Sequence, residues 1–209
     1  MRKTSLNTVY QLAKKNKKIL FVGSDLGYKV LDDMKKELPK NYLMEGVCEQ
    51  NLIGMSAGLA MEGFIPYVNT IGTFLTRRCY EQIFLDVCLH NLPVRFIGNG
   101  GGGVYAPLGP THLSIEDFAI LRAIPNMTIV APCDAVEMKK IMLETEKFKG
   151  PIYIRLGRGG DKIITKKTST PTKPPLNHSK PAWNKITGNT ANALKPSISA
   201  LYFICKFYS

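Results

Sequence analysis

The sequence has few of the features that mark membrane, secreted or metal-binding proteins. No apolar run approaches the length of a membrane-spanning helix, and the first seven residues lack the apolar core and cleavage site of a signal peptide. The five cysteines are scattered, with no C-x-x-C pair and no Cys/His spacing typical of a zinc site. We therefore expect a cytoplasmic protein with reduced thiols that contacts no membrane and supplies no metal ligands of its own.

Acidic residues are absent after Asp161, and this absence accounts for most of the formal net charge of +12. Eight lysines lie beyond Asp161, which leaves 20 basic and 16 acidic residues, net +4, in positions 1–161. Such a balance is ordinary for a metabolic enzyme, so we expect no nucleic acid partner. Hydrophobic periodicity also ends there. We interpret 1–161 as one domain and 162–209 as a basic tail, either disordered or aberrant.

Short apolar runs alternate with segments of helical periodicity along residues 1–161. The expected strands are 19–22, 42–47, 66–70, 93–97, 127–130 and 151–156. The expected helices are 4–16, 30–38, 49–62, 74–89, 115–123 and 135–148. Because most runs are too apolar to leave one face in water, they predict a parallel sheet that is covered on both sides. The fold class is therefore α/β: a doubly wound, mainly parallel six-stranded sheet with helices on both faces.

Glu49 stands where one apolar run ends and a helix of small residues begins. One interpretation is that its charge favours the positive end of the helix dipole. The other is a catalytic acid, because open α/β sheets bind ligands beyond the carboxyl ends of their strands. Asp25, Phe74 and the loop 98–112 fall at the same predicted edge.

The run Gly98-Asn99-Gly100-Gly101-Gly102-Gly103 formally satisfies G-x-G-x-x-G, but it follows the fourth strand and opens no helix. We interpret it as a flexible or closely approached loop. His112 closes this loop, and both a surface role and a role in hydrogen bonding or proton transfer remain open.

Arginines and one aromatic residue also lie near the predicted ligand edge. The arginines are either surface charges or groups suited to phosphate, because the guanidinium donors form a fixed fork. They are Arg77, Arg78, Arg155 and Arg158. Phe74 has a core and a stacking interpretation, and its own context favours the core.

Four motifs, in order, resemble the pyrimidine-binding domain of transketolases. They are Gly46-Val47-Cys48-Glu49-Gln50-Asn51, Thr73-Phe74-Leu75-Thr76-Arg77-Arg78, Gly109-Pro110-Thr111-His112 and Leu121-Arg122-Ala123-Ile124-Pro125-Asn126-Met127. The resemblance covers 1–161 and is strongest to the C-terminal subunit of split transketolases. Deoxyxylulose-phosphate synthases and dehydrogenase beta subunits share the domain but are less similar at 109–112.

The resemblance implies a thiamine-diphosphate-binding fold, thiamine diphosphate as cofactor, and roles for particular residues. The family glutamate that matches Glu49 bonds a nitrogen of the aminopyrimidine and favours the imino form, which takes the proton from the thiazolium carbon. Phe74 is expected to stack on the pyrimidine, with Asp25 and Arg77 also among the cofactor-binding residues. His112 is expected to be catalytic and to contact the sugar, and Arg158 to bind the sugar phosphate.

Three departures from the family pattern qualify the resemblance. Leu108 replaces an aspartate that contacts the donor sugar in many transketolases, so a sugar outside the pentose phosphates is open. The Gly-Asp-Gly motif that holds Mg²⁺ and the diphosphate is absent, which implies a diphosphate-binding partner subunit in a dimer or heterotetramer. Residues 162–209 do not resemble the family's third domain, and we hypothesise a frameshift or truncation near Lys166. Resequencing that finds no α/β-like continuation in another reading frame would count against it.

The sequence thus predicts a transketolase-like transferase subunit that moves a two-carbon ketol unit between sugar phosphates. It would be active only with its partner. Two alternatives stay open: an inactive remnant or non-catalytic assembly subunit, and a deoxyxylulose-phosphate-synthase-like enzyme.

Overall fold

The six strands form one sheet in which every strand pair in the described residues is parallel. The computed structural model describes residues 1–26, 29–157 and 159–165. The strand order is β2-β1-β3-β4-β6-β5. The strands are β1 (Ile19–Gly23), β2 (Tyr42–Met44), β3 (Ile65–Ile71), β4 (Arg95–Asn99), β5 (Thr128–Val130) and β6 (Ile152–Leu156). Every residue of β1, β4 and β5 is buried, as expected of parallel strands covered on both faces.

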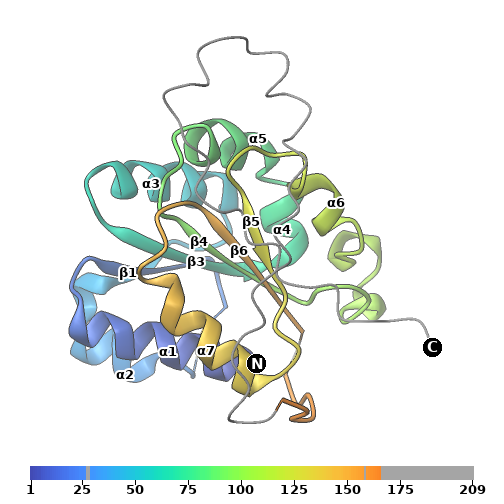
Figure 1. Ribbon diagram of the computed structural model, residues 1–209, viewed down its shortest axis with the longest axis horizontal. Coiled ribbons are helices and arrows are strands. Elements are labelled where there is room, and N and C mark those ends of the chain that lie inside the picture. The colour runs from blue at the N-terminus through green and yellow to red at the C-terminus, as the bar shows by residue number, and fades with distance from the viewer. Residues whose placement is uncertain (27–28, 158, 166–209) are drawn as a thin grey trace.

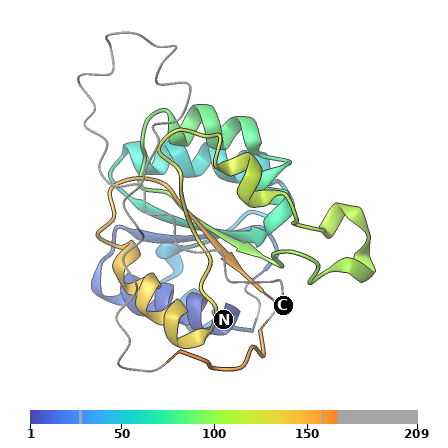
Figure 2. The same ribbon diagram turned by 45° about the vertical axis from the view of Figure 1, so that its right-hand side comes forward.

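Helices cover both faces of the sheet, and each face has its own apolar core (Figures 1 and 2). One layer contains α1 (Arg2–Lys15), α2 (Asp32–Glu37) and α7 (Ala135–Thr145). The other contains α3 (Glu49–Met61), α4 (Gly72–Thr76), α5 (Tyr80–Gln82), the π-helix η2 (Ile83–Cys88) and α6 (Asp117–Leu121). Short 3-10 turns complete the described elements: η1 (Pro39–Asn41), η3 (Ala106–Leu108) and η4 (Pro110–His112). The predicted doubly wound α/β class is confirmed.

The buried residues of α3 include the small side chains of Ser56, Ala57 and Ala60, and a glycine ends the helix. Gly63 has a φ of 84°, in the left-handed region. The N–H of Gly63 bonds to the carbonyl of Ala60, and the N–H of Phe64 to that of Leu59, which is the Schellman arrangement. The chain then turns directly into β3, so α3 lies antiparallel to the strand it covers, with Glu49 at the carboxyl edge.

The strand order creates a switch point between β1 and β3. The chain leaves β1 for α2 in one layer, and it leaves β3 for α4 in the other layer (Figure 1). The two connections diverge beyond the carboxyl ends of both strands. This is where open α/β sheets bind ligands.

The structure differs from the sequence prediction mainly between residues 72 and 89. The single helix expected over 74–89 is divided into α4, α5 and η2, with non-helical backbone at Cys79 (φ −113°, ψ 20°). The second strand is also shorter than predicted and ends at Met44. The interruption matters because Arg77 and Arg78 lie in it and point to different partners.

A buried arginine fixes the C-terminal end of α7. Arg95, fully buried on β4, donates to the backbone carbonyls of Thr145, Phe148 and Gly150. Burial lowers the pKa of Arg95 to about 10. The guanidinium therefore supplies the donors that the carbonyls at this helix end require.

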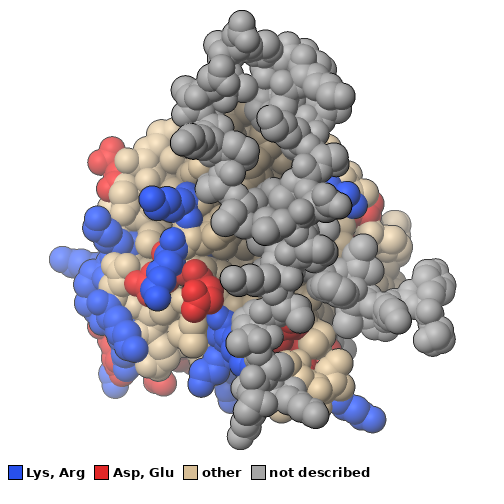
Figure 3. Space-filling model, in the orientation of Figure 1, with Lys and Arg blue, Asp and Glu red and all other residues tan. Residues whose placement is uncertain are grey.

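None of the helices in the described residues is long and apolar enough to cross a membrane. On the face shown in Figure 3, basic and acidic side chains lie close together over the α1 and α2 side of the molecule. One such pair is Lys14 and Glu37, whose Nζ and Oε2 atoms are 2.8 Å apart. The predicted tail falls largely on 166–209, outside the described residues.

Candidate active site

Glu49 is the first residue of α3, and its side chain is almost completely buried, with 2% exposed. Its Oε2 atom lies 2.7 Å from Nη1 of Arg78. Its Oε1 atom is buried, and no residue in the described part of the chain bonds to it. A buried carboxylate oxygen without a partner is costly. Oε1 therefore marks a place where a ligand group can bond.

Cys79 is a thiol that senses the charge of Glu49 and stays uncharged at neutral pH. Burial raises the pKa of Cys79 to about 12, and the charge of Glu49 adds to the effect. The Cys79 thiol donates to the carbonyl of Phe74 at 3.1 Å. It is thus a structural group and not a nucleophile.

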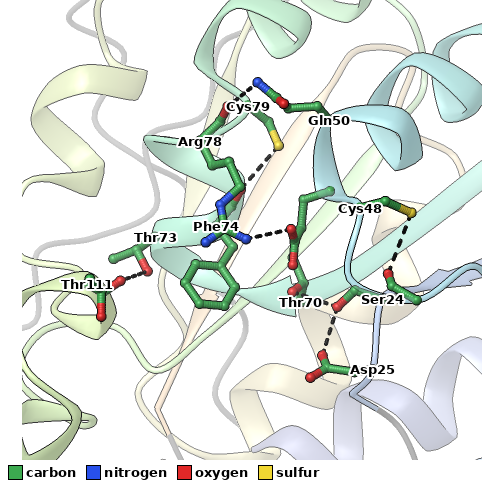
Figure 4. Close-up of polar contacts among 12 residues, drawn as sticks. Ser24, Asp25, Cys48, Gln50, Thr70, Thr73, Phe74, Arg78, Cys79 and Thr111 are labelled. Carbon is green, nitrogen blue, oxygen red and sulfur yellow. Dashed lines mark hydrogen bonds and ion pairs between the residues drawn. The ribbon is translucent and has the colours of Figure 1, made fainter.

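Phe74 lies on α4 and is half-buried. The guanidinium carbon of Arg78 lies 4.0 Å from the Phe74 ring centroid. Figure 4 draws both side chains. The His112 ring makes an edge contact with Phe74, with centroids 5.1 Å apart. Arg78 and His112 therefore both contact the Phe74 ring, and Arg78 also pairs with Glu49.

His112 ends η4, in a segment that projects from the body of the molecule (Figure 2). The Thr111 hydroxyl lies 2.9 Å from Nδ1 of His112, so Nε2 is the ring nitrogen left for another partner. The backbone of Thr111 is tied to α4, because the Thr73 hydroxyl donates to its carbonyl at 2.9 Å. The Tyr105 ring packs edge-on at 6.5 Å from the other side.

Arg77 holds this segment in place. Its guanidinium donates to the carbonyls of Pro110 and Leu113 at 2.8 and 2.9 Å. Its Nε atom pairs with Glu116 at 2.9 Å, and both side chains are about 40% exposed. In the structure, then, the contacts of Arg77 serve the His112 segment.

Asp25 follows β1 at the switch point and is exposed. The Ser24 hydroxyl bridges Asp25 Oδ1 and the Thr70 hydroxyl, each at 2.8 Å (Figure 4). Asn69 donates to the carbonyl of Leu26 at 3.1 Å. These polar contacts join the ends of β1 and β3 at the switch point.

The glycine-rich loop after β4 is closely approached by side chains of this chain itself. A Cβ atom on Gly98 would lie 2.6 Å from the Tyr153 ring, and one on Gly101 would lie 2.4 Å from Arg155. Gly100 has a φ of 81°, and a Cβ there would lie 2.2 Å from the Tyr105 ring. The glycines are required for this packing, which supports the closely approached alternative.

A buried network anchors the base of the same loop. Asp117 Oδ2 accepts from the Tyr153 hydroxyl and pairs with Arg155 Nε, each at 2.9 Å. Arg155 also donates to the carbonyl of Ser114, which accepts from the N–H of Gly102. Burial and the nearby Asp117 charge raise the pKa of Tyr153 well above its usual value. Arg155, a phosphate candidate from sequence, is thus paired within the fold.

Sequence reasoning weighed Arg78 only as a surface charge or a phosphate ligand, and it missed Ser24 and Thr70. The sequence does contain a weak signal for Arg78, Ser24 and Thr70, because each of them lies within a few residues of a strand end or of Phe74. Arg158, predicted to bind sugar phosphate, lies outside the described residues. Within those residues, no group of three or more His, Cys, Asp or Glu side chains could hold a metal ion.

Comparisons with known proteins identify the family of this domain. Residues 1–160 match the family model described as the transketolase pyrimidine-binding domain. The chain is 38% identical over 158 residues to one of the subunits of the apulose-4-phosphate transketolase of Phocaeicola vulgatus, covering 75% of this chain and 51% of that protein. It is 36% identical over 165 residues to a putative transketolase C-terminal section of Methanocaldococcus jannaschii, covering 78% and 52%. A 1-deoxy-D-xylulose-5-phosphate synthase of Gloeothece citriformis is 40% identical over 159 residues, covering 75% and 25%.

Among solved structures, a split-gene transketolase described as an inactive beta4 tetramer superposes with a TM-score of 0.71 at 32% identity. The match covers 80% of this chain and 54% of that one. The chain therefore spans about half the length, or less, of the relatives it matches.

Proposed function

Since this chain belongs to the transketolase family through its pyrimidine-binding domain, we propose that it supplies the aminopyrimidine pocket and catalytic glutamate of a thiamine-diphosphate-dependent ketol transferase. The observation that carries the proposal is the buried Oε1 atom of Glu49, which has no partner in the described residues, while Arg78 links the other oxygen of this carboxyl group to the Phe74 ring. A planar nitrogen heterocycle fits both features. It can stack on Phe74 while a ring nitrogen bonds to Oε1.

Each side chain then has a definite task. Glu49, whose side chain is 2% exposed, would hydrogen-bond the ring nitrogen through Oε1. Phe74 presents a flat apolar surface, and Asp25, held by Ser24 at the end of β1, is proposed as a further cofactor-binding residue. When bound, thiamine diphosphate supplies a carbon nucleophile suited to cleaving the bond beside a ketone.

His112 serves the substrate in this proposal. Nε2 is its free nitrogen, and it can hydrogen-bond a sugar oxygen near Phe74. Arg77 keeps the histidine segment in position through the carbonyls of Pro110 and Leu113. Arg158 is proposed to bind the phosphate of the sugar.

A partner subunit is part of the proposal. The sequence contains no Gly-Asp-Gly motif for Mg²⁺ and diphosphate, and the chain spans half of relatives named as a transketolase subunit and as a C-terminal section. We propose that a diphosphate-binding subunit provides this half of the site, with Mg²⁺, in a dimer or heterotetramer. An inactive assembly of beta subunits alone, as in the related tetramer, is consistent with that requirement.

The test is ketol transfer from a ketose phosphate by this chain mixed with a diphosphate-binding transketolase subunit, thiamine diphosphate and Mg²⁺. Glu49→Gln should lower the rate by about 10²-fold or more. Glu62→Gln makes the same chemical change at the exposed C-terminal end of α3 and should leave the rate unchanged. Equal rates for the two variants would refute the role of Glu49.

A synthase that joins a two-carbon unit from pyruvate to an aldose phosphate is the second candidate, favoured by the 40% identity to a deoxyxylulose-phosphate synthase. Replacing the ketose phosphate by pyruvate in the same assay separates the two. An assembled complex that binds cofactor but turns over neither donor would instead support the non-catalytic alternative.

A further inference from the structure

Two asparagines lie near the carboxyl ends of the central strands, where a buried parallel sheet ordinarily has apolar residues. Asn69 on β3 and Asn99 on β4 are both fully buried. Side chains alternate between the two faces along a strand, and Tyr67 and Ile97, two positions before each asparagine, belong to the core beneath α1 and α7. Asn69 and Asn99 therefore lie on that face of the sheet, opposite to α3.

The two side chains form a chain of hydrogen bonds that ends on the connection between β1 and α2. Nδ2 of Asn99 donates to Oδ1 of Asn69 and to the carbonyl of Thr70, each at 2.9 Å. Nδ2 of Asn69 in turn donates to the carbonyl of Leu26 at 3.1 Å. Reversing the Asn99 amide would bring its oxygen against two other oxygens, so its orientation is fixed.

The start of the β1–α2 connection is consequently held from both faces of the sheet. On the α3 face, the Ser24 hydroxyl bonds to the Thr70 hydroxyl and to Asp25 Oδ1 (Figure 4). On the α1 face, the carbonyl of Leu26 accepts from Asn69. Asp25 lies between these two attachments in the chain, so its backbone is tied on either side.

Stability alone does not favour this arrangement. Burying an amide costs free energy unless its polar atoms are paired, and Oδ1 of Asn99 has no partner in the described part of the chain. Two apolar side chains of the same shape would avoid this cost. A departure from the apolar pattern of a buried strand is typical of places where position matters for function.

We propose that Asn69 and Asn99 are positioning residues that hold Asp25 at the switch point. Asn99 orients the Asn69 amide, and Asn69 fixes the carbonyl of Leu26, so that the Asp25 carboxylate keeps its place beside Ser24. The proposal rests on the proposed function, in which Asp25 binds the cofactor. It adds to that site two residues from the opposite face of the sheet.

The experiment measures the backbone order parameters of Asp25 and Leu26 in the full chain by nitrogen-15 relaxation NMR. In the parent chain both residues should have values typical of rigid backbone, about 0.85. Asn69→Ala removes the bond to Leu26, and both values should fall towards about 0.6. Circular dichroism verifies that the variant is folded.

Asn41→Ala is the matched control, because Asn41 is also a buried asparagine that donates to backbone carbonyls. Its partners are Lys17 and Ile19, at the amino end of β1. This variant should lose global stability in urea unfolding but leave both order parameters unchanged. A merely structural contribution of Asn69 would make the two variants behave alike.

A double variant that combines Asn69→Leu with Asn99→Leu replaces the pair by apolar side chains of similar shape. Its midpoint of urea unfolding should equal or exceed that of the parent chain. The order parameters of Asp25 and Leu26 should nevertheless fall as they do in Asn69→Ala. If Asn69→Ala does not fold, the double variant decides the outcome by the same measurement.

Order parameters of Asp25 and Leu26 that stay at the parent values would overturn the proposal, and this measurement needs neither cofactor nor partner subunit. In the ketol-transfer assay, Asn69→Ala should raise the concentration of thiamine diphosphate for half-maximal rate about tenfold, the factor expected for one lost hydrogen bond. An unchanged concentration would refute the link between this pair and the cofactor. Absence of ketol transfer by the parent chain would count against the proposed function alone.

Discussion

Replacing Asp117 by asparagine should destabilise the domain more than any other acid-to-amide change near the site. The Asp117 side chain is 1% exposed and its two oxygens serve three groups. Oδ1 accepts from the N–H of Phe118, while Oδ2 faces the Tyr153 hydroxyl and Arg155 Nε. An asparagine keeps only one acceptor oxygen. Its amide nitrogen would then face Arg155, which cannot accept a hydrogen bond.

The magnitude follows from the burial of the partners. Removing one member of a buried ion pair costs about 3–5 kcal/mol, and the lower part of that range applies because the Arg155 side chain is 26% exposed. We therefore expect a loss of about 3–4 kcal/mol in the free energy of unfolding. Tyr153→Phe deletes a single hydrogen bond and should cost about 1–2 kcal/mol.

Urea unfolding at pH 7, followed by circular dichroism, measures these losses directly. For an m-value of about 2 kcal/mol/M, the midpoint for Asp117→Asn should fall by about 1.5–2 M with an unchanged slope. Glu116→Gln is the matched control on the preceding residue, and its exposed pair with Arg77 should be worth less than about 1 kcal/mol. Equal midpoints for Asp117→Asn and Glu116→Gln would refute the reasoning.

Other side chains give equally direct tests. Arg77→Gln removes the donors that hold the segment 110–113, so amide hydrogen exchange there should rise about tenfold while global stability falls by less than about 1 kcal/mol; unchanged exchange would show that the segment is held by other contacts. Arg95→Met leaves three backbone carbonyls without their arginine donor. Urea unfolding should show that the free energy of unfolding falls by about 3 kcal/mol. An unchanged free energy of unfolding would mean that water replaces the guanidinium. For Asp134, the N-cap of α7, burial alone would raise the pKa, but hydrogen bonds from Thr165 and backbone N–H groups outweigh it and hold the pKa well below the ordinary 3.8. Because the folded-state pKa of Asp134 is depressed, the stabilising contribution of its carboxylate is complete above pH 3.8 and is lost as the pH falls further. Urea unfolding at pH 7, 5 and 3 measures the difference in the free energy of unfolding between the parent chain and Asp134→Ala. This difference should narrow only at pH 3.

The strands of this domain could be predicted from sequence because both faces of a parallel sheet are buried. Each strand is then a continuous apolar run, and its carboxyl end is followed by polar residues such as Asp25 and Glu49. The same logic placed His112 at the ligand edge. The resemblance in four motifs added the roles of these residues, which periodicity alone could not supply.

The helix predicted over 74–89 shows a limit of prediction from hydrophobic periodicity. Its apolar spacing is helical throughout, yet the backbone turns away at Cys79. As a result, Arg77 binds the carbonyls before and after His112, while Arg78 pairs with Glu49. Two identical neighbours thus serve different parts of the site, and only their distant partners distinguish them.

The glycine run was ambiguous for a similar reason. The side chains that need the space at Gly98, Gly100 and Gly101 come from Tyr153, Tyr105 and Arg155. Two of these lie more than 50 residues away in the chain. A motif that matches a phosphate-binding pattern is here a packing requirement, and only the three-dimensional neighbours show it.

The contact between Gly98 and Tyr153 also limits how this part of the protein can evolve. A single change from Gly98 to alanine would place a methyl group 2.6 Å from the tyrosine ring, and a single loss of the tyrosine hydroxyl would remove a bond to Asp117. Each first step is therefore harmful, although a smaller residue at 153 would make room at 98. Positions 98, 117 and 153 should consequently change together across related sequences, with a fitness valley between the permitted combinations.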